Sequence, residues 1–238
     1  MEFKIFSEEL KNKANQININ LKEEQIQKFY SYMNLLLEWN EKMNLTAITD
    51  PNEIILKHFV DSLTIEKYVE EGKKVIDVGT GAGFPGIPLN IVNDEANITL
   101  LDSLNKRINF LQEVIKELNL QNINAIHARA EEFAKNKGQR ESYDIATSRA
   151  VAPLNVLLEY LLPLVKVNGS CICMKGSNIE EIDNARNALK ELGGEIEKIE
   201  KITLPESEIT RNIIIVKKVK NTPIKYPRKA GTPSKEPL

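Results

Sequence analysis

From Gly72 onward the chain alternates short β-rich runs with helical patterns, and this alternation leaves few folds open to it. The first five β-rich runs are KVIDVG at 74–79, NITLLD at 97–102, NINAIHA at 122–128, YDIATS at 143–148 and GSCICMK at 169–175. Helical patterns lie between or after these runs, at 105–119, 153–162 and 178–192. Because strands that alternate with helices of this length build βαβ units, the pattern predicts a parallel sheet covered by helices.

Two further β-rich runs, at 195–204 and 212–219, are separated only by the segment PESEITR. A connection this short is too short for a parallel crossover, so the two runs are expected to pair as an antiparallel hairpin. We therefore predict an α/β fold with a doubly wound, seven-stranded, mostly parallel sheet that ends in an antiparallel hairpin.

The residues before the first strand carry a helical pattern. Apolar side chains recur at intervals of three and four from Leu21, which predicts an amphipathic helix with Asn20 as its cap. A second helix is expected to start at Asp50, with a proline in its first turn, and a third at Asp61 that closes before Gly72.

These patterns divide the chain into three expected parts. Residues 1–71 form a helical segment that packs on the catalytic domain, residues 72–220 form the ligand-binding α/β domain, and residues 221–238 form a basic tail without a core of its own. The chain shows neither a long apolar run nor the apolar region of a secretory signal near its start, so no membrane association is expected. We expect a cytoplasmic monomer.

The cysteines and histidines are few. Cys171 and Cys173 lie two residues apart in a predicted strand, where their side chains share a face and are too close in sequence to bridge comfortably. This pattern favours a reducing compartment. With His58 and His127 as the only histidines, we expect no metal site.

Charge is distributed unevenly along the chain. The chain as a whole carries −2, but residues 217–238 hold seven basic residues and one acidic residue and so carry +6. Such an asymmetry indicates a phosphate-bearing partner, and we expect the tail to contact RNA phosphates. A competing interpretation is that Tyr226 and Pro227 fold back on the sheet and the tail stabilises the domain.

The first β-rich run leads into the glycine-rich segment GTGAGFPG, which then enters a helix. Glycines here let the backbone approach a ligand, and the helix amino end adds partial positive charge. Gly81, Gly83 and Gly86 satisfy the dinucleotide pattern GxGxxG, and Asp102 ends the next strand where an acid that binds ribose hydroxyls belongs. An NAD(P)-binding oxidoreductase therefore has to be considered.

Three features favour S-adenosylmethionine over NAD. Asp77, just before the glycines, places a carboxylate beside the ligand, which suits a cationic sulfonium and opposes a pyrophosphate. The chain lacks room for a separate dehydrogenase substrate domain. The terminal hairpin also follows the fifth strand directly, where a dinucleotide fold would continue with another parallel βαβ unit.

Later strand ends bring further polar groups to the same edge of the sheet, where ligands of open parallel sheets bind. Glu131 and the backbone around Ala130 follow the third strand and are expected to bracket the adenine. Arg149 follows the fourth strand, at the carboxyl edge of the sheet centre, and is expected to serve the chemistry.

Several longer motifs follow one another over nearly the whole chain. They are WNEKMNLTAI at 39–48, KHFVDSL at 57–63, DVGTGAGFPGIPL at 77–89, ARAEE at 128–132, SRAVAPL at 148–154 and YPRKAGTPSKEPL at 226–238. With them the sequence closely resembles the bacterial 16S ribosomal RNA guanine-N7 methyltransferases, the RsmG or GidB family.

The resemblance implies a class I S-adenosylmethionine-dependent methyltransferase fold. It further implies a substrate in 16S rRNA or a small-subunit precursor, with one guanosine methylated at N7 near the decoding site, and a link between loss of the enzyme and low-level streptomycin resistance. By matching motif, the implied cofactor contacts are Gly79, Phe84, Ala130, Glu131 and Arg149.

N7 of guanine carries a lone pair and no proton at neutral pH, so its methylation needs alignment and no general base. Because N7 is inaccessible in paired A-form RNA, the target base has to be unpaired or splayed out. Residues expected to position it are Asn44, His58 and Arg149, with Trp39 and Lys57 as further possibilities in the helical front. A non-catalytic rRNA-binding module stays open as the alternative to an enzyme.

Overall fold

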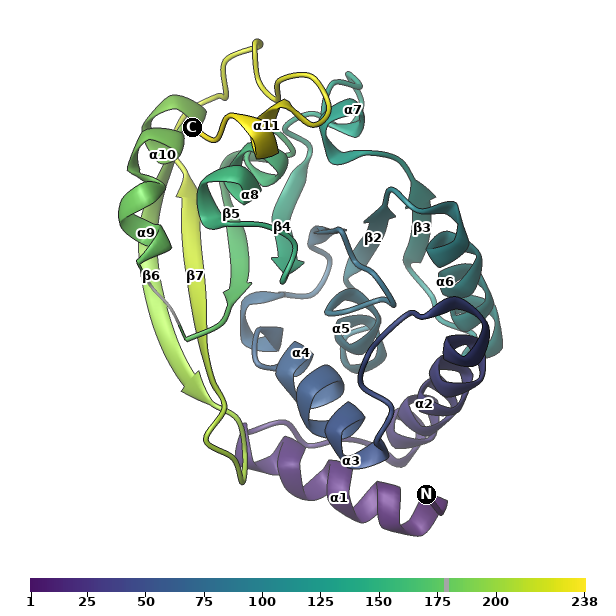
Figure 1. Ribbon diagram of the computed structural model, residues 1–238. Coiled ribbons are helices and arrows are strands. Elements are labelled where there is room, and N and C mark those ends of the chain that lie inside the picture. The colour runs from purple at the N-terminus through teal and green to yellow at the C-terminus, as the bar shows by residue number, and fades with distance from the viewer. Residues whose placement is uncertain (178–179) are drawn as a thin grey trace.

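The computed structural model describes residues 1–177 and 180–238 (Figure 1). In this part of the chain, seven strands form one sheet in the order β3-β2-β1-β4-β5-β7-β6. The strands are β1 Lys74–Val78, β2 Asn97–Asp102, β3 Ile123–His127, β4 Tyr143–Arg149, β5 Val165–Lys175, β6 Gly194–Thr203 and β7 Thr210–Lys218. Each of the seven predicted β-rich runs is a strand, and the predicted α/β fold is confirmed.

The pairing of the strands shows how the sheet ends. β1 pairs in parallel with β2 and β4, and β4 pairs in parallel with β5. β7 pairs antiparallel with both β5 and β6, so the second strand of the hairpin lies inside the sheet and the first lies at its edge. This arrangement confirms the predicted antiparallel ending.

Helices cover both faces of the sheet (Figure 1). Those that follow the strands are α5 Gly86–Val92, α6 Asn105–Glu117, α7 Ala130–Phe133, α8 Leu154–Leu161, α9 Glu181–Asn184 and α10 Arg186–Leu192. Successive residues of a strand point to opposite faces of the sheet. Val75 packs with α5 and α6 on one face, and its neighbour Ile76 packs with α8 and α10 on the other. Of the helix predicted at 178–192, positions 178 and 179 lie outside the described residues.

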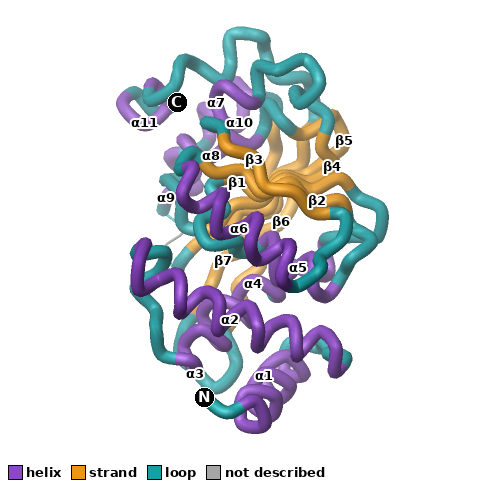
Figure 2. Tube along the Cα trace, turned by 90° about the vertical axis from the view of Figure 1, so that its right-hand side faces the viewer, coloured by secondary structure: helices purple, strands orange, loops and turns teal. Residues whose placement is uncertain are grey.

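The front of the chain packs on one of these faces. α2 (Glu23–Met43) lies along α5 and α6, and α1 (Phe3–Gln16) packs against α2 (Figure 2). The prediction of Asn20 as the cap of the amphipathic helix after Leu21 was wrong, because this helix, α2, begins at Glu23 after Lys22. There the Gln25 side chain accepts a hydrogen bond from the Lys22 N–H at 2.9 Å, which replaces a short polar cap.

No helix in the described part of the chain is long and apolar enough to span a membrane.

Residues 51–63 form one continuous helical segment. α3 (Pro51–Ile54) starts at Asp50, whose carboxylate accepts from the N–H groups of the first turn as predicted. The segment then widens into a π-helical stretch, Ile55–Val60, before α4 (Asp61–Leu63). A separate helix start at Asp61 was therefore a wrong prediction, since Val60 before it is already helical. π-Helical stretches frequently occur at functional sites.

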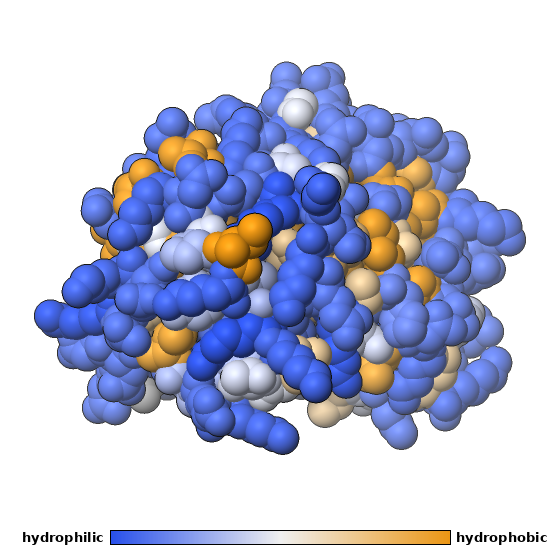
Figure 3. All heavy atoms as spheres, turned by 90° about the horizontal axis from the view of Figure 1, so that it is seen from above, coloured by the Kyte–Doolittle hydropathy of each residue, from blue (hydrophilic) through white to orange (hydrophobic). Residues whose placement is uncertain are grey.

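The tail folds back over α8 and α10, with a short helix α11 at Thr232–Lys235 (Figure 1). Tyr226 is buried, and the Arg140 guanidinium donates to the carbonyl groups of Thr222 and Tyr226 at 2.8 Å each. Seen from the side on which the tail lies, the surface of the molecule is largely hydrophilic, with scattered apolar side chains (Figure 3). The tail is thus packed on the domain, and that it stabilises the domain, as in the competing interpretation, stays a prediction.

Part of the positive charge at the C-terminal end is also neutralised inside the protein. Lys218 is fully buried, and its ammonium donates to Glu141 at 2.9 Å and to the carbonyl of Leu162 at 2.5 Å. Arg228 pairs with Glu159, and Lys225 pairs with Glu191. The +6 segment therefore offers fewer free cations to a partner than its sequence indicates.

Candidate functional site

The glycine turn after β1 is held by hydrogen bonds to β2. The N–H groups of Gly79 and Thr80 donate to the Leu101 carbonyl at 2.8 and 3.2 Å, and the Gly81 N–H donates to Asp102 Oδ2 at 3.0 Å. Gly79 and Gly81 have φ of 70° and 63°, a conformation that other residues rarely adopt. A Cβ on Gly81 would meet no heavy atom within 4 Å, so the turn leaves its backbone open to a ligand there.

Asp77 lies behind this turn. Its side chain is fully buried, and Oδ2 accepts from the Thr80 hydroxyl at 2.6 Å and from the Gly86 N–H at 2.9 Å. Oδ1 has no hydrogen-bond partner in the described chain. Burial raises the pKa of Asp77 to about 6, although the two hydrogen bonds oppose the shift. Asp77 therefore holds the turn together and retains one free carboxylate oxygen.

The other side of the turn packs against the front helices. The Tyr32 hydroxyl of α2 donates to the Ala82 carbonyl. A Cβ on Gly83 would stand 2.7 Å from the Tyr32 hydroxyl oxygen and 2.5 Å from Ile87 Cδ1. Gly83 is thus required for the close approach of α2 to the turn, and its backbone does not face the cleft described below.

A cleft of about 680 Å³ opens at the carboxyl edge of the sheet, between the strand ends and the front of the chain. The cleft is lined by residues of the turn after β1, of the ends of β2, β4 and β5, of β7, and of the front segment. The lining residues that matter below are Thr46, Lys57, His58, Asp61, Gly79, Gly81, Phe84, Asp102, Arg149 and Arg211. The ends of the parallel strands and the helical front therefore build one site together.

A smaller cavity of about 160 Å³ adjoins the cleft. The two spaces share Gly79, Asp102, Ser103 and Val151 as lining residues. The smaller one is further lined by Ala128–Glu131 after β3. Glu131 is buried, and its Oε1 accepts from the N–H of Gly231 at 2.9 Å, so the tail fixes a residue of the cavity wall.

Asp102 stands between the two spaces and is fixed in place. Its Oδ1 accepts from the Leu104 N–H at 2.9 Å, and its Oδ2 accepts from Gly81 and from the Arg107 guanidinium at 3.2 Å. The side chain keeps only 2 % of its surface exposed. Because an ionised carboxylate can accept about four hydrogen bonds, Asp102 retains capacity for one more donor.

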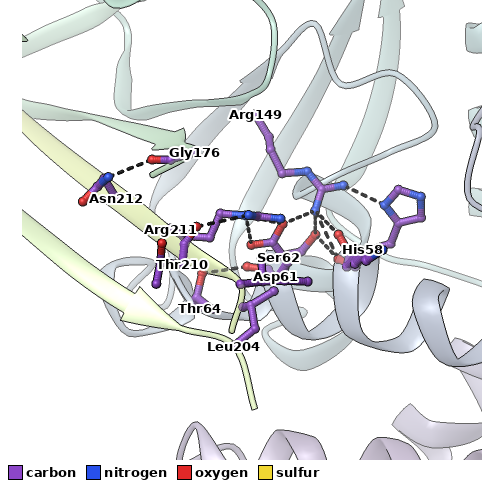
Figure 4. A network of polar contacts seen from close by, with 12 residues as sticks. His58, Asp61, Ser62, Thr64, Arg149, Gly176, Leu204, Thr210, Arg211 and Asn212 are labelled. Carbon is purple, nitrogen blue, oxygen red and sulfur yellow. Dashed lines mark hydrogen bonds and ion pairs between the residues drawn. The ribbon is translucent and has the colours of Figure 1, made fainter. Parts of the chain in front are cut away.

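Arg149 joins the end of β4 to the front segment (Figure 4). Its guanidinium donates to Asp61 Oδ2 at 3.2 Å and to the carbonyl of Lys57 at 3.2 Å, and it lies 5.0 Å from the centre of the Phe84 ring. Arg211 from β7 donates to both oxygens of Asp61, at 3.1 and 3.2 Å. One buried carboxylate thus binds two guanidinium groups, and the cluster retains positive charge.

His58 completes this cluster. Its ring stacks on Phe84 with centroids 4.4 Å apart, and its Nδ1 lies 3.2 Å from a guanidinium nitrogen of Arg149. Burial, with the charge of Arg149 adding to it, lowers the pKa of His58 to about 3. The imidazole is therefore neutral at physiological pH.

The predicted site residues fall into two groups. Gly79, Gly81, Phe84, Asp102, His58 and Arg149 line the cleft, and Ala130 and Glu131 line the smaller cavity. Asp77, Gly83 and Asn44 line neither space of the described chain. Whether the lining residues bind a cofactor stays a prediction.

The residues proposed to grip the base also differ in position. Asn44 is exposed and ends α2 in a left-handed conformation, with φ of 48°. Trp39 packs against Phe110 with ring centroids 5.6 Å apart. Lys57 lines the cleft and pairs with Glu53 at 2.6 Å. Of these three, Lys57 alone lies where a base in the cleft would be.

Asp61 and Arg211 were not predicted as site residues, although the structure places both in the cleft. The sequence pattern made Asp61 a helix start and placed Arg211 in the short connection before the last strand, whereas the structure places Arg211 in β7. Their pairing across 150 positions leaves no local signal in the sequence.

Within the described residues, no group of three or more His, Cys, Asp or Glu side chains is arranged to hold a metal ion.

Comparison with known sequences adds a family. Residues 25–213 match the family model described as "GidB: rRNA small subunit methyltransferase G". The chain is 56 % identical over 226 residues to the ribosomal RNA small subunit methyltransferase G of Acetivibrio thermocellus, covering 94 % of this chain and 93 % of that protein. The protein of the same name from Alkaliphilus metalliredigens is 52 % identical over 232 residues, with coverage of 96 % and 97 %.

Solved structures share the fold at much lower identity. A SAM-dependent methyltransferase from Aquifex aeolicus matches with a TM-score of 0.54 at 18 % identity, over 73 % of this chain and 96 % of that one. M. jannaschii TYW2 in complex with AdoMet matches with a TM-score of 0.51 at 14 % identity, over 67 % and 77 %. The seven-stranded sheet with its antiparallel hairpin is thus the fold of these methyltransferases.

Proposed function

This chain belongs to the rRNA small subunit methyltransferase G family, and we propose that it transfers a methyl group from S-adenosylmethionine to N7 of one guanine in 16S ribosomal RNA. The observation that carries the proposal is the cleft at the carboxyl edge, which the glycine turn shares with a positively charged cluster of Arg149 from β4 and Arg211 from β7 beside the helical front. The turn suits a small cofactor, and the cluster suits a polyanion.

The residues of the two spaces fit S-adenosylmethionine. Gly81 leaves room for a ligand against its backbone, and Asp102 has capacity to accept from ribose hydroxyls. The segment Ala130–Glu131 would hold the adenine in the smaller cavity. Asp77 lines neither space, so its carboxylate would act on a cationic ligand only from behind the turn. When bound, the cofactor supplies an electrophilic methyl group.

The site also fits a reaction without a general base. His58 is the one histidine in the cleft of the described chain, and its Nδ1 faces a guanidinium that can only donate. The Nδ1 atom of His58 is therefore not free to accept a proton from the substrate. N7 of guanine has no proton to lose, so the protein's task is to align the base with the methyl group.

The proposed substrate leads us to assign the protein to the cytoplasm, where a reducing environment agrees with the free, buried Cys171 and Cys173.

We further propose a monomer. The edge strand β6 carries charged residues along its length, which disfavours pairing with a second copy. Sedimentation analysis at several protein concentrations tests this, and a concentration-dependent dimer would contradict it.

A binding and transfer experiment tests the activity. S-adenosylmethionine, or its demethylated product, at 100 times its dissociation constant should raise the free energy of unfolding by about 2.7 kcal/mol, and NAD should not. Labelled methyl groups should then enter 16S rRNA from a strain that lacks the enzyme, at one guanine N7. Binding without transfer would favour the non-catalytic rRNA-binding module, and stabilisation by NAD alone would contradict the methyltransferase assignment.

Gly81→Val separates the site from the fold. We expect it to abolish cofactor-induced stabilisation, because a Cβ at this position projects into the ligand space. Gly72→Val is a matched control, since Gly72 has a similar φ of 71° and a Cβ added there would likewise meet nothing within 4 Å, but it lies far from the cleft. Both variants should lose about 1–3 kcal/mol of stability from backbone strain. Equal cofactor binding by the two would show that the turn is only structural.

A further inference from the structure

Thr46 lies in the loop between α2 and α3 and lines the cleft with a half-buried side chain. Its backbone N–H donates to the side-chain oxygen of Asn40 at 2.9 Å, which fixes the loop to the end of α2. Its hydroxyl oxygen lies 2.9 Å from His58 Nε2 and 3.0 Å from the N–H of Ile48. The side chain is therefore oriented by two neighbours, and the backbone that carries it is fixed by a third.

The direction of each hydrogen bond in this chain of contacts follows from Arg149. A guanidinium has no acceptor atom, so His58 Nδ1 accepts from Arg149 and carries no proton. A neutral imidazole holds its one proton on the other nitrogen, so Nε2 donates to Thr46 Oγ1. The positively charged guanidinium thus determines the histidine tautomer, as partners of one ring nitrogen commonly do.

The consequence falls on the Thr46 hydroxyl. Its oxygen accepts from His58 and from the Ile48 N–H, and these two bonds occupy both of its lone pairs. Its own hydrogen therefore points to neither neighbour, and no acceptor for it is found among the described residues. Since Thr46 lines the cleft, the site offers a hydrogen-bond donor of fixed polarity to whatever enters.

The histidine keeps this polarity over the working pH range. Burial and the charge of Arg149 disfavour a second proton on His58 and lower its pKa to about 3. Asp61 pairs with Arg149 from the other side, but it also pairs with Arg211, so it compensates the charge of Arg149 only in part. Lys57, on the same helical segment, acts in both directions: its backbone favours protonation of His58 through a hydrogen bond, and its charge disfavours it, while burial and Arg149 remain the larger causes.

Guanine and adenine differ next to N7. Guanine presents the O6 acceptor beside N7, and adenine presents the N6 amino donor there. A donor of fixed polarity pairs with the first and opposes the second. Resting on the proposed function, we propose that the Thr46 hydroxyl donates a hydrogen bond to O6 of the target base and selects guanine over adenine.

The test is a comparison of enzyme variants on a set of bases, in the full-length protein. The substrate is a short RNA that carries the mapped target nucleotide as guanosine, as inosine, which keeps O6, or as 2-aminopurine riboside, which keeps N7 but lacks O6. Thr46→Val removes the hydroxyl at equal size, and Thr46→Ser retains it. Thr49→Val is the matched control, because Thr49 is an exposed threonine in the same loop.

We expect Thr46→Val to lower kcat/KM roughly tenfold on guanosine and inosine, and by less than about twofold on 2-aminopurine riboside. Thr46→Ser and Thr49→Val should stay within about twofold of the parent enzyme on all three bases. The ratio of kcat/KM on guanosine to kcat/KM on an RNA with adenosine at the target should fall in Thr46→Val and stay unchanged in Thr46→Ser and Thr49→Val. The stabilisation by S-adenosylmethionine should be unchanged in every variant.

Two results would overturn the proposal. One is a Thr46→Val enzyme equal to Thr49→Val on guanosine, and the other is an equal loss on all three bases, which would mark a structural role. Should Thr46→Val fail to fold, Thr46→Ala carries the same comparison. A parent enzyme that methylates no guanine N7 would instead contradict the proposed function, and that result is separately visible before any variant is made.

Discussion

The carboxylates of Asp61 and Glu159 are both buried, and both bind arginine from a distant part of the chain, but their surroundings differ. Asp61 binds Arg149 and Arg211 where the cleft opens, and both arginines line the cleft. Glu159 binds Arg228 under the tail, through contacts of 2.6–3.1 Å that include the backbone N–H of Arg228. The first cluster faces a ligand space, and the second closes a contact between α8 and the tail.

The difference lies in the number of cations for each carboxylate. At Glu159 one arginine matches one carboxylate, so the pair carries no net charge to attract a partner. At Asp61 two arginines share one carboxylate, which leaves positive charge in the cleft and a guanidinium N–H that orients His58. The same pair of residue types therefore serves stability in one place and the proposed recognition of RNA in the other.

The largest expected effect concerns stability at the tail. Arg228→Ala should lower the free energy of unfolding by about 3–5 kcal/mol, because it leaves the fully buried Glu159 without its counter-ion. Urea denaturation measures this. Lys229→Ala, a change of the exposed neighbouring residue, should stay within about 0.5 kcal/mol of the parent protein. Equal stability of the two variants would show that the tail cluster does not hold the domain.

The second prediction concerns activity at the cleft. Arg149→Lys keeps a positive charge near Asp61 but loses the fork of donors that reaches His58, and it should lower kcat/KM about 10- to 100-fold. Arg228→Lys is the corresponding change at the tail and should leave kcat/KM nearly unchanged. Single-turnover methyl transfer to 16S rRNA measures both. If the two variants lose activity alike, the contrast between the clusters does not hold.

The third prediction uses pH to separate the two regions. Unfolded His58 takes up a proton below about pH 6.5, whereas folded His58 does so only near pH 3, so its contribution to stability falls as pH drops below 6.5. The difference in unfolding free energy between the parent protein and His58→Gln should therefore shrink by about 2 kcal/mol from pH 7 to pH 5.

Urea denaturation at each pH measures this difference, and His127→Gln controls for the loss of a histidine outside the cleft. Asp77 contributes the opposite slope, because its folded pKa of about 6 lies above the ordinary value for a carboxyl group. Its contribution is the same in the parent protein and the variant and cancels in the difference. A pH-independent difference would mean that folded His58 titrates normally.

The smallest expected effect concerns the unpaired cations of the tail. Lys229 has no ion pair within the described residues, and if it contacts a phosphate, Lys229→Ala should flatten the log-log salt dependence of rRNA binding by about 0.7–0.9. Arg228→Lys should leave this slope unchanged, because the side chain is bound to Glu159. Binding measured at several salt concentrations decides the matter, and an unchanged slope in Lys229→Ala would confine the tail to its structural role.

Local patterns in the sequence determined the fold. The strands, the crossovers and the closing hairpin could be predicted because alternation, periodicity and connection length act over a few neighbouring residues. The same holds for the turn at Gly79 and Gly81, where the conformation of the backbone depends on the absence of a Cβ. The longer motifs that resemble a known family added the expected substrate and cofactor.

The tertiary structure alone decided which of those residues face the cleft. Asp77 and Gly83 belong to the predicted motif, yet one lies behind the turn and the other receives α2, because the packing of the front helices determines which side of the turn is open. Asp61 and Arg211 meet across 150 positions, and no local pattern reports such a pair. The polarity of the Thr46 hydroxyl likewise depends on Arg149 through His58, a chain of contacts that exists only once β4 and the front segment have come together.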